Sequence, residues 1–540
     1  MSLHQAFRRV PVPPQMAQRS TPYIIPAPTR GIVQSENYTF MQPGAAIICD
    51  NWVPTMRGVK LRGGCTRWCA LPEQLPVVSG FEYKSATAER MFAANDTKLY
   101  DVTTSVPVLV KGGQSSGNYA ATQMANAGGD FLIAVNDRGD PPLRFDGTAW
   151  TVLNGGQITG PAGTPVAVGE NLVYVWKYRS RLFFIEADSM NAWYLDVNSI
   201  QGALQVIPLS GAANKGGKLV FGATWSIDAG DGTDDKCVFY TSEGEAIIFT
   251  GSNPSDAANW RQEGRYQVSK PMGMNAHMSI GGDLLIATVD GIAPLSQAIT
   301  KTADQLELAM LTRNIKPMWR AEVADKNNLP WTMKKWDQYG GAFVTTPGGP
   351  VGKRYCLVVN TQTTAWCRFV GYDATCFLYS RNSLFFGTQG GVIMQADRTG
   401  FDDGLPYTAI LVGGWEMFQT PPVSVVWRQA RATFTSSSGE PFQPQLAACT
   451  DYVLRLPTPP VPAADPGVPD VWDQGLWDQA LWDQESALVT PVVRNTGWVS
   501  IGETGFSHAP IVQVAVAQQG KPNVELISIA AMYEKLGANV

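Results

Sequence analysis

The sequence predicts an all-β protein whose central part is a β-propeller. Gly (53) and Pro (37) are abundant among the 540 residues, while charged residues make up only 16%. That composition is typical of many short strands joined by turns. A pattern of polar turn, apolar run and polar turn also recurs from about residue 80 to 400. We expect about seven blades, with six or eight also fitting the irregular spacing, an extended N-terminal arm and a C-terminal β domain. A series of β-sandwiches is the alternative.

Residues 1–70 are expected to form the extended arm and a docking segment. The first 28 residues hold six prolines, which favour an extended chain, with a disordered tail as the alternative. Eight basic residues against two acidic ones give this segment a net charge of +6, leaving −11 for the rest of the chain. It could therefore dock onto an acidic partner. The candidate docking residues are Arg8, Arg9, Arg57, Lys60, Arg62 and Arg67.

Residues 71–405 are predicted to form the propeller, because a strand-sized unit repeats through them. The segments "GGDFLIAVND" (128–137) and "GGDLLIATVD" (281–290) match at seven of ten positions. Gaps of 40 to 58 residues between repeats suit one four-stranded sheet each. The apolar runs start at Met91, Phe131, Leu182, Val238, Leu284, Ala342 and Leu384.

Four repeats end with a turn followed by tryptophan. Large aromatic side chains at these positions are expected to fill the wedge between neighbouring sheets. Radial closure of the sheets would also hide their edges. The four residues are Trp150, Trp193, Trp260 and Trp366.

Residues 406–540 are predicted to form the C-terminal β domain, with longer alternating strands, a Pro-rich spacer (457–470) and a WDQ repeat (472–484). The repeat places Trp472, Trp477 and Trp482 five residues apart. A period of five matches neither helix nor strand, so tight turns held by the Asp side chains fit better. We interpret the three tryptophans as a structural aromatic clip that packs within the chain; a contact between subunits is the alternative.

We predict no catalytic, cofactor or metal site. The three histidines, His4, His277 and His508, have no evident pairing. The formal G-x-S-x-G at 113–117 lacks the strand-to-helix elbow of a serine hydrolase. Cys65 and Cys69 have no second Cys or His pair near them, so zinc binding is not expected, and all eight cysteines are taken as free thiols.

The segment "DAGDGTDD" (228–235) has two readings. Asp228, Asp231, Asp234 and Asp235 could supply oxygen ligands to Ca²⁺, but the ligand order and closing Glu of an EF-hand are missing. A Gly- and Asp-rich surface loop explains the same residues. Neither reading is decided by the sequence.

Charge and targeting features bear on partners and location. An acidic body does not look like a DNA clamp, because such proteins neutralise phosphates with basic residues. No secretory h-region opens the sequence, and no run of about 18 apolar residues occurs. We therefore expect no membrane span.

Several stretches together resemble the tail nozzle (tail-hub) proteins of short-tailed bacteriophages, also known as packaged-DNA stabilisation proteins. The first runs from Thr29 to Gly64, "TRGIVQSENYTFMQPGAAIICDNWVPTMRGVKLRGG". Others are "RSRLFFIEADSMNAWYLDVNSIQG" (179–202), "TSEGEAIIFTGSNPSDAANW" (241–260), "GGDLLIATVDGIAPLS" and the WDQ repeat with the "TGWVSIGETGFSHAPIVQVAV" that follows it. Their order and combination carry the resemblance, which spans nearly the whole chain.

The resemblance implies a non-enzymatic virion protein made in the bacterial host cytoplasm. It implies a homo-oligomeric ring, usually a hexamer, below the portal and adaptor, with tail fibre, spike or needle proteins as further neighbours. The ring would retain packaged double-stranded DNA and conduct it during ejection without sequence-specific binding. The alternatives are a receptor- or glycan-binding tail module, or a propeller glycosidase working with two paired carboxylates.

Overall fold

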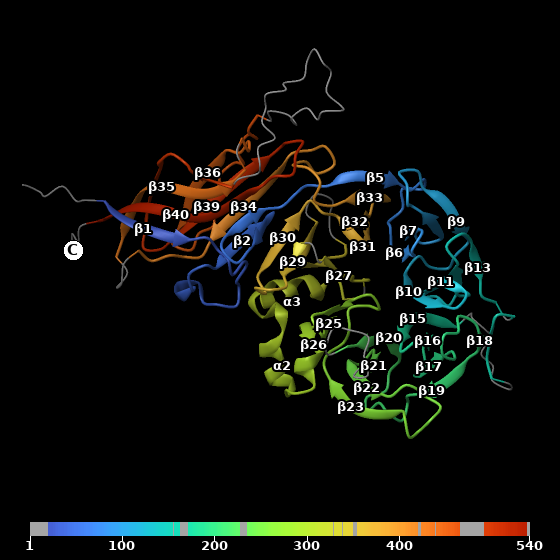
Figure 1. Ribbon diagram of the computed structural model, residues 1–540. Helices are drawn as coiled ribbons and strands as arrows, with labels where there is room; N and C mark the ends of the chain where they lie inside the picture. Colours follow the sequence, from blue (N-terminus) through green and yellow to red (C-terminus); the bar gives the residue numbers. More distant parts are fainter. Residues whose placement is uncertain are drawn as a thin grey trace, which may run out of the picture.

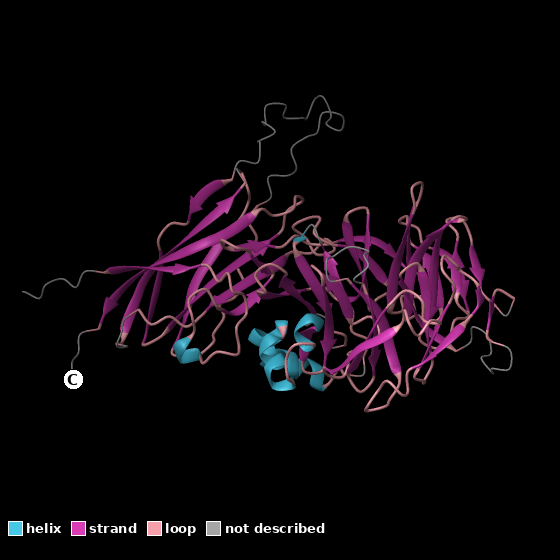
Figure 2. Cartoon of the chain, turned by 60° about the horizontal axis from the view of Figure 1, so that its bottom comes forward, coloured by secondary structure: helices cyan, strands magenta, loops and turns pink. Residues whose placement is uncertain are grey.

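A computed structural model describes residues 20–536 apart from 155, 162–170, 227–234, 328, 337–338, 349–353, 419–422, 438 and 465–490. Strands dominate and helices are few and short (Figure 2). Figure 1 shows a ring of small sheets on the right, two larger stacked sheets on the left and the helices at the lower centre. The described chain is therefore mostly β, as its composition predicts.

The ring is a β-propeller, which confirms the predicted fold class. Six blades are separate antiparallel sheets, a number within the predicted range. The first two are β6 (Ser79–Lys84), β7 (Glu89–Ala94), β8 (Lys98–Asp101), β9 (Val108–Gly112), and β10 (Tyr119–Asn126), β11 (Gly129–Asn136), β12 (Leu143–Phe145), β13 (Trp150–Val152). The next two are β15 (Leu172–Tyr178), β16 (Arg181–Glu186), β17 (Asn191–Tyr194), β19 (Gln205–Pro208), and β20 (Leu219–Trp225), β21 (Lys236–Thr241), β22 (Glu245–Thr250), β23 (Arg261–Gln267). A short parallel pair, β14 (Ile158–Thr159) with β18 (Gly202–Ala203), lies beside the third blade.

The fifth blade has three strands, β24 (His277–Ile280), β25 (Asp283–Thr288) and β26 (Gly291–Pro294), followed by helices. The helical segment comprises α1 (Leu295–Ala298), α2 (Ala303–Ala309), η2 (Leu311–Ile315) and α3 (Lys316–Ala324). Pro317 lies in the first turn of α3, where its missing N–H costs nothing, and Trp319 and Val323 bury one helical face. These helices were not predicted from the sequence pattern.

The sixth separate blade is completed by a strand from the start of the chain. Its strands β31 (Ala374–Ser380), β32 (Ser383–Thr388) and β33 (Val392–Gln395) are joined by β5 (Thr66–Ala70), which pairs with β33. β31 also contacts β6 of the first blade. Residues from both ends of the propeller region thus close the ring.

Between the fifth and sixth separate blades stand β27 (Met333–Trp336), β28 (Gly341–Thr345), β29 (Tyr355–Asn360) and β30 (Trp366–Val370). They occupy a further radial position, because β27 contacts both β24 and β31. They are also one half of an eight-stranded sheet that continues from β30 into β2 (Ala46–Asp50), β34 (Tyr407–Gly413), β39 (His508–Val516) and β36 (Pro444–Thr450). One sheet therefore belongs to both the propeller and the C-terminal body.

The repeat signal identifies one strand in every sheet. All seven predicted starts of apolar runs lie in the second strand of their sheet: β7, β11, β16, β21, β25, β28 and β32. These strands are buried on both faces, as β16 illustrates, because each lies between two neighbouring blades. A strand buried on both faces reads as an unbroken apolar run, which made the repeat visible in the sequence.

Two of the repeat-ending tryptophans pack between blades as expected. The ring of Trp150 lies 4.9 Å from that of Phe92 in the preceding blade, and Trp260 lies 6.2 Å from Phe183. Trp366 opens β30 and is fully buried. Trp193 differs, because it lies in the third strand of its blade and not after the last turn.

The C-terminal body is a two-sheet β-sandwich, with one sheet formed by β2, β34, β39 and β36. The other contains β3 (Trp52–Pro54), β4 (Val59–Leu61), β40 (Val524–Lys535), β35 (Val425–Ser436), β37 (Val492–Asn495), β38 (Val499–Gly505) and β1 (Thr21–Pro26). The short helix η1 (Tyr38–Phe40) lies in the connection between β1 and β2. A single hydrophobic core joins both sheets to the adjoining blades.

The N-terminal segment differs from the predicted arm in its described part. Residues 20–70 are woven into the protein, with β1 paired to β40, β4 to β40 and β5 to β33. The prolines at 22 and 26 lie at the start and end of β1, which pairs with only one neighbour, and edge strands tolerate proline. Residues 1–19 lie outside the described part of the chain. The start of β34 at Tyr407 falls next to the predicted boundary at 405/406.

Candidate functional site: the axial cavity of the propeller

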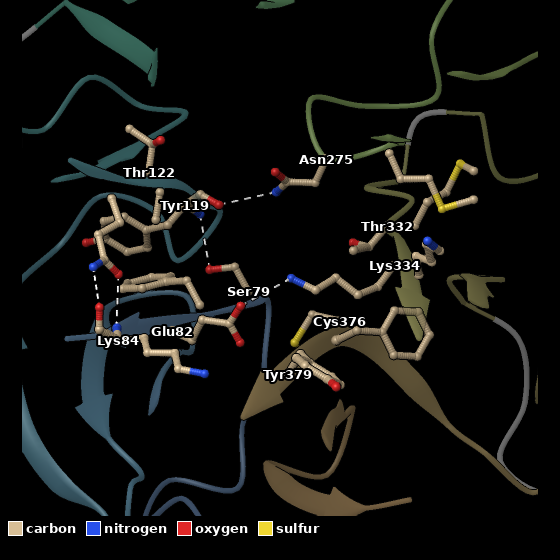
Figure 3. A pocket seen from close by; sticks show the side chains of 18 of the residues that line it. Ser79, Glu82, Lys84, Tyr119, Thr122, Asn275, Thr332, Lys334, Cys376 and Tyr379 are labelled. Carbon is tan, nitrogen blue, oxygen red and sulfur yellow. Dashed lines mark hydrogen bonds and ion pairs between the residues drawn. The ribbon is translucent and has the colours of Figure 1, made fainter. Parts of the chain in front are cut away.

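A cavity of about 820 Å³ lies among the first strands of five sheets, β6, β10, β24, β27 and β31 (Figure 3). Its volume is in the range of about 300–1,000 Å³ that is typical of small-molecule sites. The lining is mixed: apolar side chains alternate with hydroxyl, amide and charged side chains from the five strands. This cavity is the main candidate site in the described part of the chain.

Neutral side chains gather where these first strands begin. The Ser79 hydroxyl donates to Gly117 O (2.6 Å) and accepts from Tyr119 N (3.1 Å), joining the starts of β6 and β10. The Asn275 amide reaches across to Tyr119 O and to Asn118 Oδ1, both at 3.2 Å. This end of the cavity is therefore fixed by hydrogen bonds between blades (Figure 3).

One charge pair crosses the middle of the cavity. Lys334 Nζ on β27 lies 3.9 Å from Glu82 Oε1 on β6 (Figure 3). Burial raises the pKa of the Glu82 carboxyl, and the positive charge of Lys334 partly offsets that rise. Glu82 Oε2 is buried with no hydrogen-bond partner among the described residues. The pair leaves room for a further donor at this carboxylate.

The far end of the cavity, where the first strands finish, is charged. Glu89 Oε1 accepts from Ser380 Oγ (2.8 Å) and from the backbone N–H of Arg381 (2.6 Å). Burial alone raises the pKa of Glu89, but these two hydrogen bonds reverse the effect and lower it. Lys84 is opposite Glu89 in the β6–β7 register, and the side-chain amide of Gln123 holds the Lys84 backbone from the next blade.

The His and Cys side chains that line the cavity, His277 and Cys376, are not placed to act as a base or a nucleophile. His277 begins β24, but its ring stacks on Phe221 at 4.3 Å between centroids and its Nε2 lies 3.3 Å from Tyr174 Oη. Burial lowers the pKa of His277 to about 4, so the ring stays neutral at pH 7. Burial also raises the pKa of the Cys376 thiol to about 12, which keeps it protonated and unreactive. Across the described residues, no cluster of three or more His, Cys, Asp or Glu side chains is placed to hold a metal ion.

The structure corrects one candidate docking residue, Arg62. Its side chain is fully buried and forms a bidentate pair with Asp402 (2.9 and 2.6 Å). The rings of Tyr407 and Tyr372 lie 4.1 and 4.5 Å from its guanidinium carbon. Burial alone would lower the pKa of Arg62, but the Asp402 carboxylate reverses this and raises it. Arg62 is a structural residue at the junction of propeller and sandwich and is closed to a surface partner.

The three other described docking candidates lie on two separate surfaces. Arg57 is largely exposed on the β3–β4 turn and pairs with Glu525 at 2.8 Å. Lys60 lines the same shallow pocket of about 420 Å³, and burial lowers its pKa. Arg67 lies apart on β5 and pairs with Asp403 at 2.6 Å. The structure therefore does not bring the four described candidates into one basic patch, and Arg8 and Arg9 lie outside the described residues.

Other predicted features lie partly or wholly outside the described residues. These are the WDQ tryptophans Trp472, Trp477 and Trp482, together with Asp228, Asp231 and Asp234. Asp235 is described and buried, and its backbone oxygen accepts from Tyr178 Oη at 2.9 Å.

His508 is buried and stacks on Phe418. All eight cysteines are free and buried.

The fold and this cavity place the protein among β-propeller proteins, with a β-sandwich attached. No known protein family and no curated protein matches the chain. The β-propeller domain of Myceliophteria thermophila Cps50 (Swd1) is similar at 12% identity with a TM-score of 0.37, covering 63% of this chain and 100% of that one. YCF48 from Cyanidioschyzon merolae is similar at 10% identity with a TM-score of 0.36, covering 61% of this chain and 98% of that one. Such likeness concerns the fold and says nothing of function.

The helices of the described part offer no membrane-crossing element. None of them is long and apolar enough to span a bilayer.

Proposed function

We propose that the protein is a structural component of a short-tailed phage virion, a subunit of the tail nozzle ring that retains packaged DNA and conducts it during ejection. The resemblance of segments from Thr29 to the end of the chain motivates this proposal. The homo-oligomer, a hexamer as the resemblance implies, would contact the portal and adaptor above it and fibre, spike or needle proteins below. Localisation in the virion follows from the same proposal.

The observation that carries the proposal is the continuity of the chain between its two bodies. The eight-stranded sheet passes from β30 to β2, where Arg368 Nε and Nη2 donate to Asp50 at 2.6 and 2.8 Å. Arg62 and Asp402 form a second buried ion pair at the same junction. A sheet shared by both bodies suits a wall that must retain DNA better than an enzyme that must close on a substrate.

Charge supports the same reading. Residues 71–540 carry a net charge of −11, so a wall made of them repels duplex DNA and lets it slide without sticking. A basic clamp would grip the phosphates.

Negative-stain microscopy and native mass spectrometry of the purified protein, alone and mixed with its portal and adaptor, test the proposal. We expect a closed ring with a lumen wide enough for duplex DNA, in at least the mixed sample. A monomer under all conditions, or an open assembly without a lumen, would reject it.

A second candidate function is recognition of a glycan by the propeller. The axial cavity favours it, because its volume is in the range of small-molecule sites and its hydroxyl and charged side chains can bind sugar hydroxyls.

A further inference from the structure

Basic side chains line the axial cavity together with the carboxylates of Glu82 and Glu89. Glu89 is already engaged by Ser380 and the backbone of Arg381, and Glu82 lies next to Lys334. The basic residues are Lys84, Lys334, Lys335 and Arg381.

Two of these cations are accessible at the charged end of the cavity. Lys84 and Arg381 are exposed, and neither forms an ion pair within 4 Å in the described part of the chain. They lie near each other because Glu89 is opposite Lys84 in the strand register and bonds the backbone of Arg381. Both charges interact with the Glu89 carboxylate, and each exposed side chain still has N–H donors for a second anionic group.

The rest of the lining suits hydroxyl groups. Thr122, Thr332 and Ser279 supply hydroxyls along the length of the cavity. These groups can donate and accept, as recognition of sugar hydroxyls requires. The ring of Tyr379, which also lines the cavity, offers an apolar face beside them (Figure 3).

We propose that the axial cavity binds a small acidic saccharide, with the ligand's carboxylate between Lys84 and Arg381 and its hydroxyls on the neutral side chains deeper in the cavity. The inference rests on the second candidate function and not on ring formation. Neither the propeller fold nor the resemblance to nozzle proteins implies an acidic saccharide as the ligand.

Isothermal titration calorimetry on the full-length protein tests it, with glucuronate, glucose and inorganic phosphate as probes. We expect glucuronate to bind, glucose to bind at least about tenfold more weakly, and the glucuronate affinity to fall with added salt. Equal binding of phosphate and glucuronate would overturn the saccharide assignment. Absence of glucuronate binding at millimolar concentration would overturn the site.

Variants locate the binding in the cavity. Lys84→Met and Arg381→Met are expected to weaken glucuronate binding by about tenfold each, since each removes a charge-assisted hydrogen bond. Lys215→Met, which removes an exposed lysine that does not line the cavity, is the matched control and should leave the affinity unchanged.

Glu82→Gln gives a test of opposite sign. It removes one negative charge from the cavity and releases Lys334, so glucuronate should bind several-fold more tightly. Weaker binding in this variant, or equal loss of affinity in Lys215→Met, would contradict the proposed electrostatics. Ring assembly, followed separately by microscopy, distinguishes failure of this site from failure of the nozzle proposal.

Discussion

Replacing Arg62 with methionine should strongly destabilise the protein, although Arg62 is far from the axial cavity. In the variant the Asp402 carboxylate loses its bidentate partner, and its side chain is only 15% exposed to water. Removing one member of a buried ion pair typically costs about 3–5 kcal/mol. Val370 O also loses the Arg62 donor, whereas Gly63 O keeps Tyr372 Oη.

The expected loss is therefore about 4 kcal/mol of unfolding free energy, because Asp402 can regain some water and some hydrogen bonds remain. That is a large share of the roughly 5–15 kcal/mol by which proteins are usually stable. This loss of unfolding free energy is measured by urea titration, with tryptophan fluorescence and far-UV circular dichroism as the two signals. If the two signals give different transitions, the propeller and the sandwich unfold separately in the variant.

Two further variants separate charge from packing. Arg67→Met removes an exposed pair with Asp403 and should change the unfolding free energy by less than about 0.5 kcal/mol. Adding Asp402→Asn to Arg62→Met removes the stranded charge and should recover about 2 kcal/mol. If Arg62→Met is as stable as Arg67→Met, or if the double variant recovers nothing, the assignment of Arg62 as a junction residue is wrong.

Three other predictions concern separate parts of the chain. Gly222→Ala places a Cβ about 2.4 Å from the ring of Trp176 and should cost about 1–3 kcal/mol in urea unfolding, whereas Gly211→Ala, with open space around it, should be nearly neutral. Because the pKa of His277 is lowered to about 4 on folding, the unfolded state binds more protons between pH 6.5 and 4, so His277 makes stability fall as the pH is lowered through this window. His277→Gln should remove up to about 2 kcal/mol of that pH dependence, and an unchanged difference between pH 6.5 and 4.5 would contradict the neutral ring. Replacing Trp472, Trp477 and Trp482 with alanine should lower the melting temperature or the yield of rings; wild-type behaviour in both assays would exclude the aromatic clip.

The blades could be predicted from the sequence because their second strands are local, apolar and repeated. "GGDFLIAVND" contains the whole of β11, and "GGDLLIATVD" contains the whole of β25 with the two glycines before it. Each such strand is recognisable without knowing its partners. The repeat at Leu284 predicts the fifth blade, but not that the blade has only three strands followed by helices. The helical spacing of Trp319 and Val323 in α3 covers one short helix and does not stand out in the sequence.

Features that depend on distant partners could not be predicted. Arg62 reads as one basic residue among several, and only the approach of Asp402, 340 positions away, makes it a buried structural residue. Lys84 and Arg381 are likewise ordinary surface residues in the sequence, and closure of the ring between β31 and β6 brings them to one cavity. No local pattern encodes such pairings, since they depend on the order of blades around the axis.

The path of residues 20–70 has a consequence for synthesis of the chain. Ser20 donates to Glu534, 514 positions later, and β5 waits for β33 to close its blade. At the usual translation rate of about 5–20 residues per second, β1 emerges roughly 25–100 s before its neighbour β40 exists. The first strands must therefore stay unpaired, and protected from other copies of themselves, until the ribosome has nearly finished.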